Sequence, residues 1–368
     1  MCDIKTGIEL ELWVIDQTGQ LCDGREIADA HDRIEPEFIG PLVEVQTKPH
    51  ENEKRLRGDL KAILQTAIRA ADASGKQLVP LGTPLTESDT PANCERGRLF
   101  ETIYGDDVRS AKNCAGTHIH FENKNVVDQL NLLTALDPAL ALVSSSPYYC
   151  GTREEYCSRA RAYRKKCGAE FRGYCDLWNY TDSLDEWQQR TEYMYAAFKR
   201  LAGDRGVSEE VVAEYFTPGD TVLNPVRLSE CHPTVEWRAP DAALPSQVIQ
   251  LALDVGRLVS QAQTKSLTYG VPGVRRDCIQ VPKFPAIQKL SQQAIDSGLA
   301  DPKVREYLQR LGFDLSQYQP LSPQLSGPST LSDRDARSMR IEQARRLRAD
   351  VHTLTTGSAA PTSTVPSI

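Results

Sequence analysis

The sequence lacks a basic excess and any long apolar run. Its 368 residues include 43 Lys and Arg against 50 Asp and Glu, a formal net charge of −7. A chain without surplus positive charge cannot neutralise many phosphates, which argues against nucleic acid as the main partner. No uninterrupted apolar stretch would span a bilayer, and the first residues lack the pattern of a signal peptide. We therefore expect a cytoplasmic protein with neither a membrane nor a nucleic acid as partner.

Paired-cysteine and phosphate-loop motifs are also missing. None of the ten cysteines forms Cys-x-x-Cys, which argues against a zinc ribbon or a redox motif, so reduced thiols are expected. No Gly-x-x-x-x-Gly-Lys-[Ser/Thr] loop occurs, and no Gly-x-Gly-x-x-Gly follows a strand. Any phosphate site is therefore neither a P-loop nor a Rossmann turn.

The most informative stretch that is present runs from Gly7 to Asp16. Its alternation predicts a strand with an apolar face and with Glu9 and Glu11 side by side on the opposite face. Two carboxylates so close repel each other unless water or a cation separates them. Either the acidic face of the strand is exposed to solvent, or it binds a hard metal ion such as Mg²⁺ or Mn²⁺.

Other predicted strands carry polar groups on one face. These are 42–47 with Glu44 and with Glu37 upstream, 117–122 with His118 and His120, 221–228 with Arg227, and 234–241 with Glu236 and Arg238. Each has an ordinary interpretation: an exposed carboxylate, core histidines or a surface ion pair. Histidine is scarce, with six in the chain, so two at strand spacing also suit metal or phosphate binding.

The rest of the chain predicts helices and a polar end. Helical patterns cover 52–74, 128–143, 183–203, 246–269, 285–297, 302–312 and 332–352. Composition shifts toward Ser, Pro and Gln from residue 317, and 353–368 has the composition of a disordered tail. We expect one catalytic domain over 1–316, a linker and helix over 317–352, and the tail over 353–368.

Two basic stretches leave alternatives open. Arg96 and Arg98 lie near a predicted turn, and 153–172 is rich in arginine and lysine. Both stretches suit either solvated surface or the binding of an acidic substrate.

Taken together, the polar strand faces describe one site. On neighbouring strands of an antiparallel sheet they would form a concave acidic surface with histidine and arginine at its edges. Such a surface suits nucleotide phosphates bridged by Mg²⁺, with arginines holding the oxygens of a transferring phosphoryl group.

These motifs, in this order, resemble the glutamate–cysteine ligase and carboxylate–amine ligase family. The resemblance covers roughly residues 5–265, includes the small-residue loop 144–147, and is closest to archaeal-type glutamate–cysteine ligases of halophiles. It implies an α+β fold of the glutamine-synthetase-like superfamily, with a curved antiparallel sheet and helices packed on its outer face.

The resemblance also implies a reaction and a set of site residues. ATP would phosphorylate the γ-carboxylate of L-glutamate, and the amine of L-cysteine would displace phosphate, a step of glutathione biosynthesis. The implied Mg²⁺ or Mn²⁺ ligands are Glu9, Glu11, Glu44, His118 and Glu236. Arg238 and Arg227 would touch transferring phosphate or a substrate carboxylate, and Glu37, Arg98, Tyr104 and His120 would line the substrate pocket. A ligase for another acid or amine, and a non-catalytic nucleotide- or metal-binding relative, remain alternatives.

Overall fold

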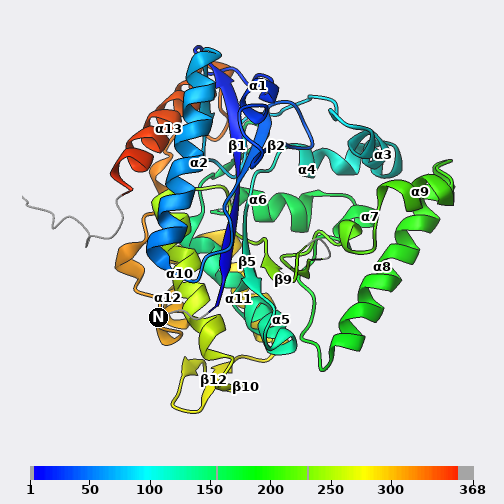
Figure 1. Ribbon diagram of the computed structural model, residues 1–368, viewed down its shortest axis with the longest axis vertical. Helices are drawn as coiled ribbons and strands as arrows, with labels where there is room; N and C mark the ends of the chain where they lie inside the picture. The colour runs from blue at the N-terminus through cyan, green and yellow to red at the C-terminus, as the bar shows by residue number, and fades with distance from the viewer. Residues whose placement is uncertain (1–3, 155, 230–231, 355–368) are drawn as a thin grey trace, which may run out of the picture.

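An antiparallel sheet lies at the centre of the structure, between two groups of helices. The computed structural model describes residues 4–154, 156–229 and 232–354. Figure 1 shows α2, α10 and α13 on one side of the sheet, and α3, α4, α8 and α9 on the other. The expected α+β class, with an antiparallel sheet and helices covering its outer face, is confirmed. Nearly all of the expected tail lies outside the described residues.

The sheet is built around β1 (Thr6–Asp16), the strand predicted from the alternation of its residues. The strand order is β2-β3-β1-β5-β9-β8, with β4 also paired to β1, and every pair in this sheet is antiparallel. The other strands are β2 (Ile34–Pro36), β3 (Leu42–Gln46), β4 (Lys76–Val79), β5 (Thr117–Glu122), β8 (Val226–Leu228) and β9 (Thr234–Trp237). Ile8, Leu10 and Leu12 are buried, as their shared face predicts.

Amphipathic helices cover the apolar face of the sheet. They are α2 (Glu53–Ala73), α10 (Pro245–Gln261) and α13 (Asp333–Thr353). The side chain of Asn52 caps α2 by accepting the backbone N–H of Lys54 at 2.8 Å, and the buried Leu56, Leu60 and Leu64 recur at helical spacing. Burial of these apolar faces supplies the main stabilising term of the fold.

The last helix belongs to the same hydrophobic core as the sheet. Ala344, Leu347 and Val351 of α13 are buried in that core. Asp350 accepts the backbone N–H of Ser246 at 2.8 Å, which ties α13 to the first turn of α10. The division of the chain at residue 316 stays a prediction.

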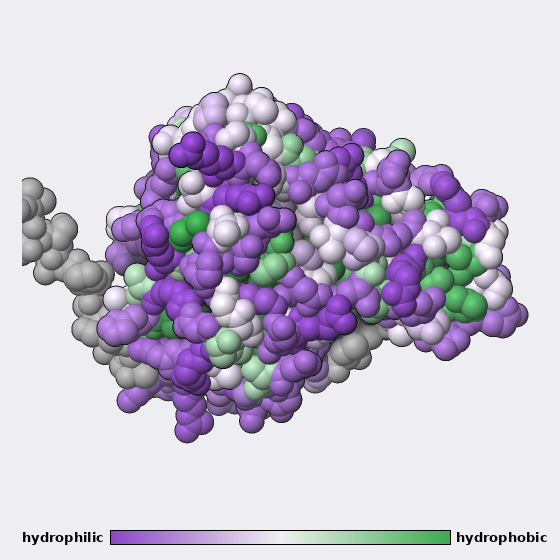
Figure 2. All heavy atoms as spheres, turned by 90° about the horizontal axis from the view of Figure 1, so that it is seen from above, coloured by the Kyte–Doolittle hydropathy of each residue, from purple (hydrophilic) through white to green (hydrophobic). Residues whose placement is uncertain are grey.

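A second hydrophobic core lies on the opposite side of the sheet. It joins α3 (Glu95–Tyr104), α8 (Leu184–Asp204) and α9 (Glu209–Tyr215) with the short helices α4 (Arg109–Lys112) and α7 (Ala169–Arg172). The short helix α6 (Ser158–Arg161) instead contributes Ala160 to the core of the sheet. Aromatic rings dominate it, with Phe100 and Phe216 at 4.8 Å and Tyr104 and Phe171 at 4.8 Å between centroids. Seen from above, the molecule narrows toward this side, and apolar residues gather near the α9 end (Figure 2).

Two expected helices are shorter than predicted. The first ends at Ala135, as α5 (Val126–Ala135), and Pro138 starts a tighter helix over Asp137–Val143 because proline cannot donate an α-helical hydrogen bond. The second ends at Gln261, and Ser266–Tyr269 forms β10 instead, parallel to β12 (Cys278–Val281), which also pairs with β11 (Gly273–Val274). Helices α11 (Phe284–Ser297) and α12 (Pro302–Arg310) match the sequence pattern.

No single helix within the described residues is long and apolar enough to cross a bilayer. Only α5 together with residues 137–143 meets that test, as a pair bent by 57°, and the second member of the pair is buried in the core. The eight cysteines that the structure describes form no disulfide.

A buried carboxyl lies just beyond β9. Asp241 accepts the backbone N–H of Ser145 at 2.9 Å, and the hydroxyl of Ser145 accepts the backbone N–H of Gly82 at 2.6 Å. A Cβ atom on Gly82 would approach the Asp241 carboxyl to 2.6 Å, so only glycine fits there. Burial raises the pKa of Asp241 to about 6. This carboxyl therefore couples the stability of the fold to pH.

Replacing Asp241 with asparagine should remove that pH dependence. Below about pH 4 the carboxyl is protonated in both states, whereas between pH 4 and 6 it ionises only in the unfolded chain. Stability should therefore fall by up to about 3 kcal/mol as pH rises through 6, and less in Asp241→Asn. Urea unfolding across pH 4–7 measures this, with the exposed Asp204→Asn as control. Equal slopes for wild type and Asp241→Asn would contradict the prediction.

Candidate active site

The register of the sheet places the predicted polar residues directly opposite one another. The facing pairs are Glu11 with Glu44, Glu9 with His118, His120 with Glu236, and Arg227 with Glu236, across β3, β1, β5, β9 and β8. Because side chains of facing residues project on the same side of a sheet, these groups converge on one polar face. The predicted constellation is therefore brought together by strand pairing alone.

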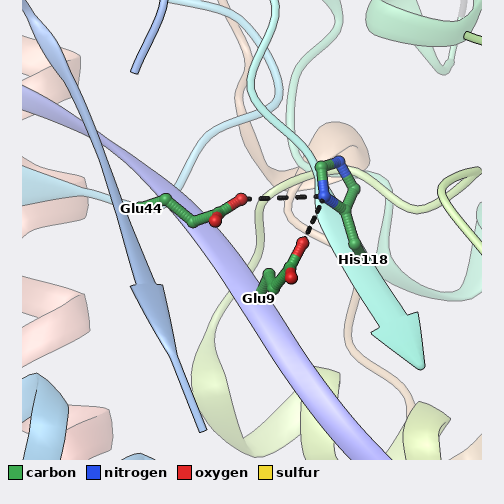
Figure 3. A group of neighbouring side chains, drawn as sticks. All are labelled: Glu9, Glu44 and His118. Atoms are coloured by element: carbon green, nitrogen blue, oxygen red, sulfur yellow. Dashed lines mark hydrogen bonds and ion pairs between the residues drawn. The ribbon is translucent and has the colours of Figure 1, made fainter. Parts of the chain in front are cut away.

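His118 lies at the centre of this face. Its Nδ1 atom is 3.0 Å from a Glu9 oxygen and 3.6 Å from a Glu44 oxygen (Figure 3). The same nitrogen lies 3.6 Å from Glu236, and Nε2 lies 3.4 Å from Glu11. The imidazole is thus surrounded by carboxylates on three neighbouring strands.

Glu236 is held between two arginines. Its side chain is fully buried, and its two oxygens accept hydrogen bonds from Arg227 and Arg238. Although burial opposes ionisation, the two guanidinium groups hold the pKa of Glu236 well below its usual range. Each arginine keeps partial exposure, 23% for Arg227 and 17% for Arg238, so both can also reach a ligand.

Negative charge exceeds positive charge elsewhere on the face. Burial raises the pKa of Glu44 well above its usual range, and the neighbouring carboxylates add to this effect. Burial and the charge of Glu11 raise the pKa of Glu37 to about 8. Glu9 behaves oppositely, because hydrogen bonds with both histidines outweigh burial and lower its pKa. Additional positive charge at this face would therefore be electrostatically favourable.

The donor set fits a hard divalent cation. Three groups have ligand atoms within 4.8 Å of one another: Glu9, Glu44 and His118; Glu9, His120 and Glu236; and Glu11, Glu37 and Glu44. The buried Nε2 atoms of His118 and His120 both face carboxylate oxygens, of Glu11 at 3.4 Å and of Glu9 at 3.1 Å respectively. Carboxylate oxygens with a few imidazole nitrogens suit Mg²⁺ or Mn²⁺, and an ion would neutralise the surplus negative charge.

The structure brings nine of the predicted site residues to this face and leaves two away from it. Glu9, Glu11, Glu37, Glu44, His118, His120, Arg227, Glu236 and Arg238 meet there. Arg98 instead lies on the outer side of α3, 56% exposed, in an ion pair with Glu95. Tyr104 is buried in the second core, where its ring packs against Phe171 and Tyr174.

A cavity of about 350 Å³ opens beside the acidic face, and different residues of α3 line it. Besides Gly97 these are Arg96 and Phe100, which lie one helical turn apart and therefore on the same side of the helix. Glu11, Glu37 and Arg238 line the end of the cavity that meets the sheet. The spacing of Arg96 and Phe100 was visible in the sequence, but nothing there indicated which side of α3 faces the sheet.

The basic stretch 153–172 is divided between the surface and the interior, with Arg153, Lys165 and Lys166 exposed and Arg159 and Arg164 paired with buried groups. Arg164 makes a two-fold hydrogen bond to the buried Asp137, at 2.7 Å for each nitrogen. Arg159 is buried and donates to the carbonyls of Arg238, Ala239 and Pro240 at 3.2–3.3 Å, so it fixes the chain just after β9. A side chain on Gly116 would collide with this guanidinium. Sequence alone could not single Arg159 out of a run of basic residues.

The fold is one that a ligase of known structure shares. The bifunctional glutathione synthetase from Pasteurella multocida superposes with a TM-score of 0.53 at 12% identity, over 95% of this chain and 53% of that protein. Residues 5–293 match the family model of glutamate–cysteine ligase family 2. The chain therefore belongs to this family, which confirms the resemblance and the fold that it implied.

Curated relatives agree with the family at low identity. A protein provisionally named glutamate–cysteine ligase 2-1, from Paenarthrobacter aurescens, is 25% identical over 70% of this chain and 64% of its own length. A protein provisionally named glutamate–cysteine ligase 2, from Bordetella avium, is 30% identical over 42% of each chain. The chain thus spans less than two thirds of the length of these relatives.

Proposed function

We propose that the protein is an ATP-dependent carboxylate–amine ligase that joins the γ-carboxylate of L-glutamate to the amine of L-cysteine. The products are γ-glutamylcysteine, ADP and phosphate, as in a step of glutathione biosynthesis. The observation that carries the proposal is one face of the sheet, on which carboxylates and two histidines surround a glutamate that is paired with two arginines. Membership of the ligase family supports it. The cytoplasmic location stays a prediction, and the proposed partners are small molecules.

The reaction needs an activated acid. A carboxylate and an ammonium do not condense favourably in water, so ATP must first convert the γ-carboxylate into an acyl phosphate. Glu9, Glu11, Glu44, His118 and Glu236, with Glu37 and His120 beside them, would hold Mg²⁺ or Mn²⁺. When bound, the ion neutralises charge on the phosphate oxygens of ATP.

The arginines have the geometry to bind a transferring phosphoryl group. A guanidinium presents a planar fork of donors that matches two phosphate oxygens. Arg227 and Arg238 lie on either side of Glu236, whose carboxylate fixes both guanidinium groups before substrate binds. Donors fixed in advance stabilise charge that develops in the transition state more than flexible ones do.

The amine would enter from the cavity beside the sheet. Glu11 and Glu37 line its inner end, where the negative charge of Glu11 attracts an ammonium group. A carboxylate there can also accept a proton as the amine attacks the acyl phosphate. The apolar walls keep water away from the acyl phosphate, which would otherwise hydrolyse.

The proposal predicts a partial reaction without the amine. Because activation needs only ATP and the acid, glutamate and ATP should give slow phosphate release or cyclisation to pyroglutamate. Addition of cysteine should accelerate ADP formation, and excess chelator should stop both reactions until Mg²⁺ or Mn²⁺ is restored. A coupled ADP assay with glutamate held constant measures this, with glutamate omitted as control. Full activity in excess chelator would contradict the metal site.

A further inference from the structure

The cavity beside the sheet is bounded by two very different surfaces. Its inner end is polar and carries Glu11, Glu37 and Arg238 from the sheet side of the molecule. Its walls come from the second hydrophobic core, which has no other contact with substrate in the proposed reaction. The second core therefore shapes the space next to the point where the amine nitrogen must lie.

The walls are apolar and aromatic. Phe38, Phe100 and Phe171 line them, together with Val108 and Leu223. Phe100 is only partly buried although the rings of Phe38, Tyr104, Phe198 and Phe216 pack around it at 4.8–6.4 Å. A ring held by four others cannot turn to fill the space beside it. The cavity is therefore formed before any ligand binds.

A cation, 44% exposed, lines the cavity where it opens to solvent. Arg96 pairs with Asp220 at 2.9 Å, and its guanidinium lies over the rings of Phe100 and Phe216 at 6.0 and 5.5 Å. A molecule that spans the cavity would meet negative charge at the inner end, aromatic surface along its length, and Arg96 at the mouth.

Resting on the proposed ligase function, we infer that the amine site is larger than cysteine requires, and that it also accepts, and favours, amines with a large apolar or aromatic side chain. The cavity volume of about 350 Å³ falls within the roughly 300–1,000 Å³ of pockets that enclose drug-sized ligands. The methylene and thiol of cysteine would leave most of the aromatic wall in contact with water. A larger apolar side chain removes that surface from water, which favours its binding. The class comprises bulky apolar amino acids and arylalkylamines, which share an ammonium and an apolar body.

The test compares amines in the ADP assay at saturating ATP, Mg²⁺ and glutamate. The amines are alanine, cysteine, leucine, phenylalanine and 2-phenylethylamine. The last two differ only in the α-carboxylate, so their comparison shows whether Arg96 binds that group. We expect kcat/KM to be at least tenfold higher for leucine, phenylalanine or 2-phenylethylamine than for alanine and cysteine. Cysteine or alanine as the best amine would overturn the inference but leave the ligase function standing.

A variant that fills the cavity identifies the site responsible. Ala111 lines the cavity, and Ala111→Phe should lower the preference for phenylalanine over alanine at least tenfold, with an unchanged KM for glutamate. Ala73→Phe, on the exposed end of α2, is the matched control and should keep the wild-type preference. A rise in the KM for glutamate with an unchanged amine preference would assign the cavity to the acid and overturn the inference. Leu223→Trp is the second filling variant if Ala111→Phe melts early.

Direct binding separates this inference from the proposed function. Calorimetric titration of 2-phenylethylamine into the wild-type protein without ATP should show binding that Ala111→Phe loses and Ala73→Phe keeps. Absence of binding to the wild type would overturn the inference, even where cysteine supports turnover. Binding without any amine-stimulated ADP formation would support the pocket and refute the ligase reaction.

Discussion

Glu236→Gln should lower ADP formation at least a thousandfold and destabilise the protein. Glu236 is the fully buried carboxylate that fixes Arg227 and Arg238 and offers an oxygen to the proposed cation site. Glutamine keeps the shape but cannot neutralise two guanidinium groups. The substitution therefore disrupts both the metal site and the arginine side chains that would bind phosphate. The effect on turnover should be larger than for a residue with one role.

The effect of this substitution on stability follows from the same pairing. Removal of one member of a buried charge pair leaves the other uncompensated, at a cost of roughly 3–5 kcal/mol. We expect a loss near 3 kcal/mol by urea unfolding in chelator, because both arginines keep some exposure. Glu44→Gln should not destabilise, since burial and like charges already raise the pKa of Glu44. The exposed Glu342→Gln is the control. Equal losses for Glu236→Gln and Glu44→Gln would contradict this electrostatic description.

Arg238→Lys should reduce turnover strongly although it preserves the charge. Arg238 donates to Glu236 and lies 3.5 Å from the Nδ1 atom of His118, at the meeting point of the acidic face and the cavity. Lysine offers a point charge in place of a planar fork that holds two phosphate oxygens. Loss of one such donor costs roughly 2–4 kcal/mol of transition-state stabilisation, or about 30- to 1,000-fold in rate.

The ADP assay with saturating substrates measures the effect of Arg238→Lys. The exposed Arg345→Lys, on the outer face of α13, should behave as wild type. The melting temperature of Arg238→Lys in chelator should stay near that of the wild type, since the charge next to Glu236 is retained. A change in turnover of less than threefold would show that Arg238 does not contact the transferring group.

The sheet and its polar face were predictable because successive side chains of a strand point to opposite faces, so one stretch of sequence shows both the buried face and the polar face. In β1, apolar side chains alternate with Glu9 and Glu11, so the buried face and the site face are both visible in one stretch. The short strands around it repeat this pattern, which is why Glu44, His118 and Glu236 could be placed on the same face without a structure.

The residues that line the cavity were not predictable in this way. The side of α3 that faces inward is set by Phe171, Phe198 and Phe216, which lie far away in the sequence. A pattern within α3 therefore could not choose Arg96 and Phe100 over Arg98. Tyr104 lies on the same side of α3 as Phe100 but is buried in the packed part of the second core. The end of α10 was missed for a related reason, because Ser266–Tyr269 becomes a strand only through pairing with Cys278–Val281.

The transfer of oxygen from the acid to phosphate tests the central claim most directly. Glutamate labelled with ¹⁸O in its γ-carboxylate is incubated with ATP, Mg²⁺ and the best amine, and the products are analysed by mass spectrometry. Activation by phosphoryl transfer predicts ADP, a γ-glutamyl amide and inorganic phosphate that carries one ¹⁸O atom per turnover. AMP carrying the label would show adenylyl transfer instead, and unlabelled phosphate would show simple ATP hydrolysis. Either of these results would contradict the proposal that the polar face of the sheet is the active site of a ligase that forms an acyl phosphate.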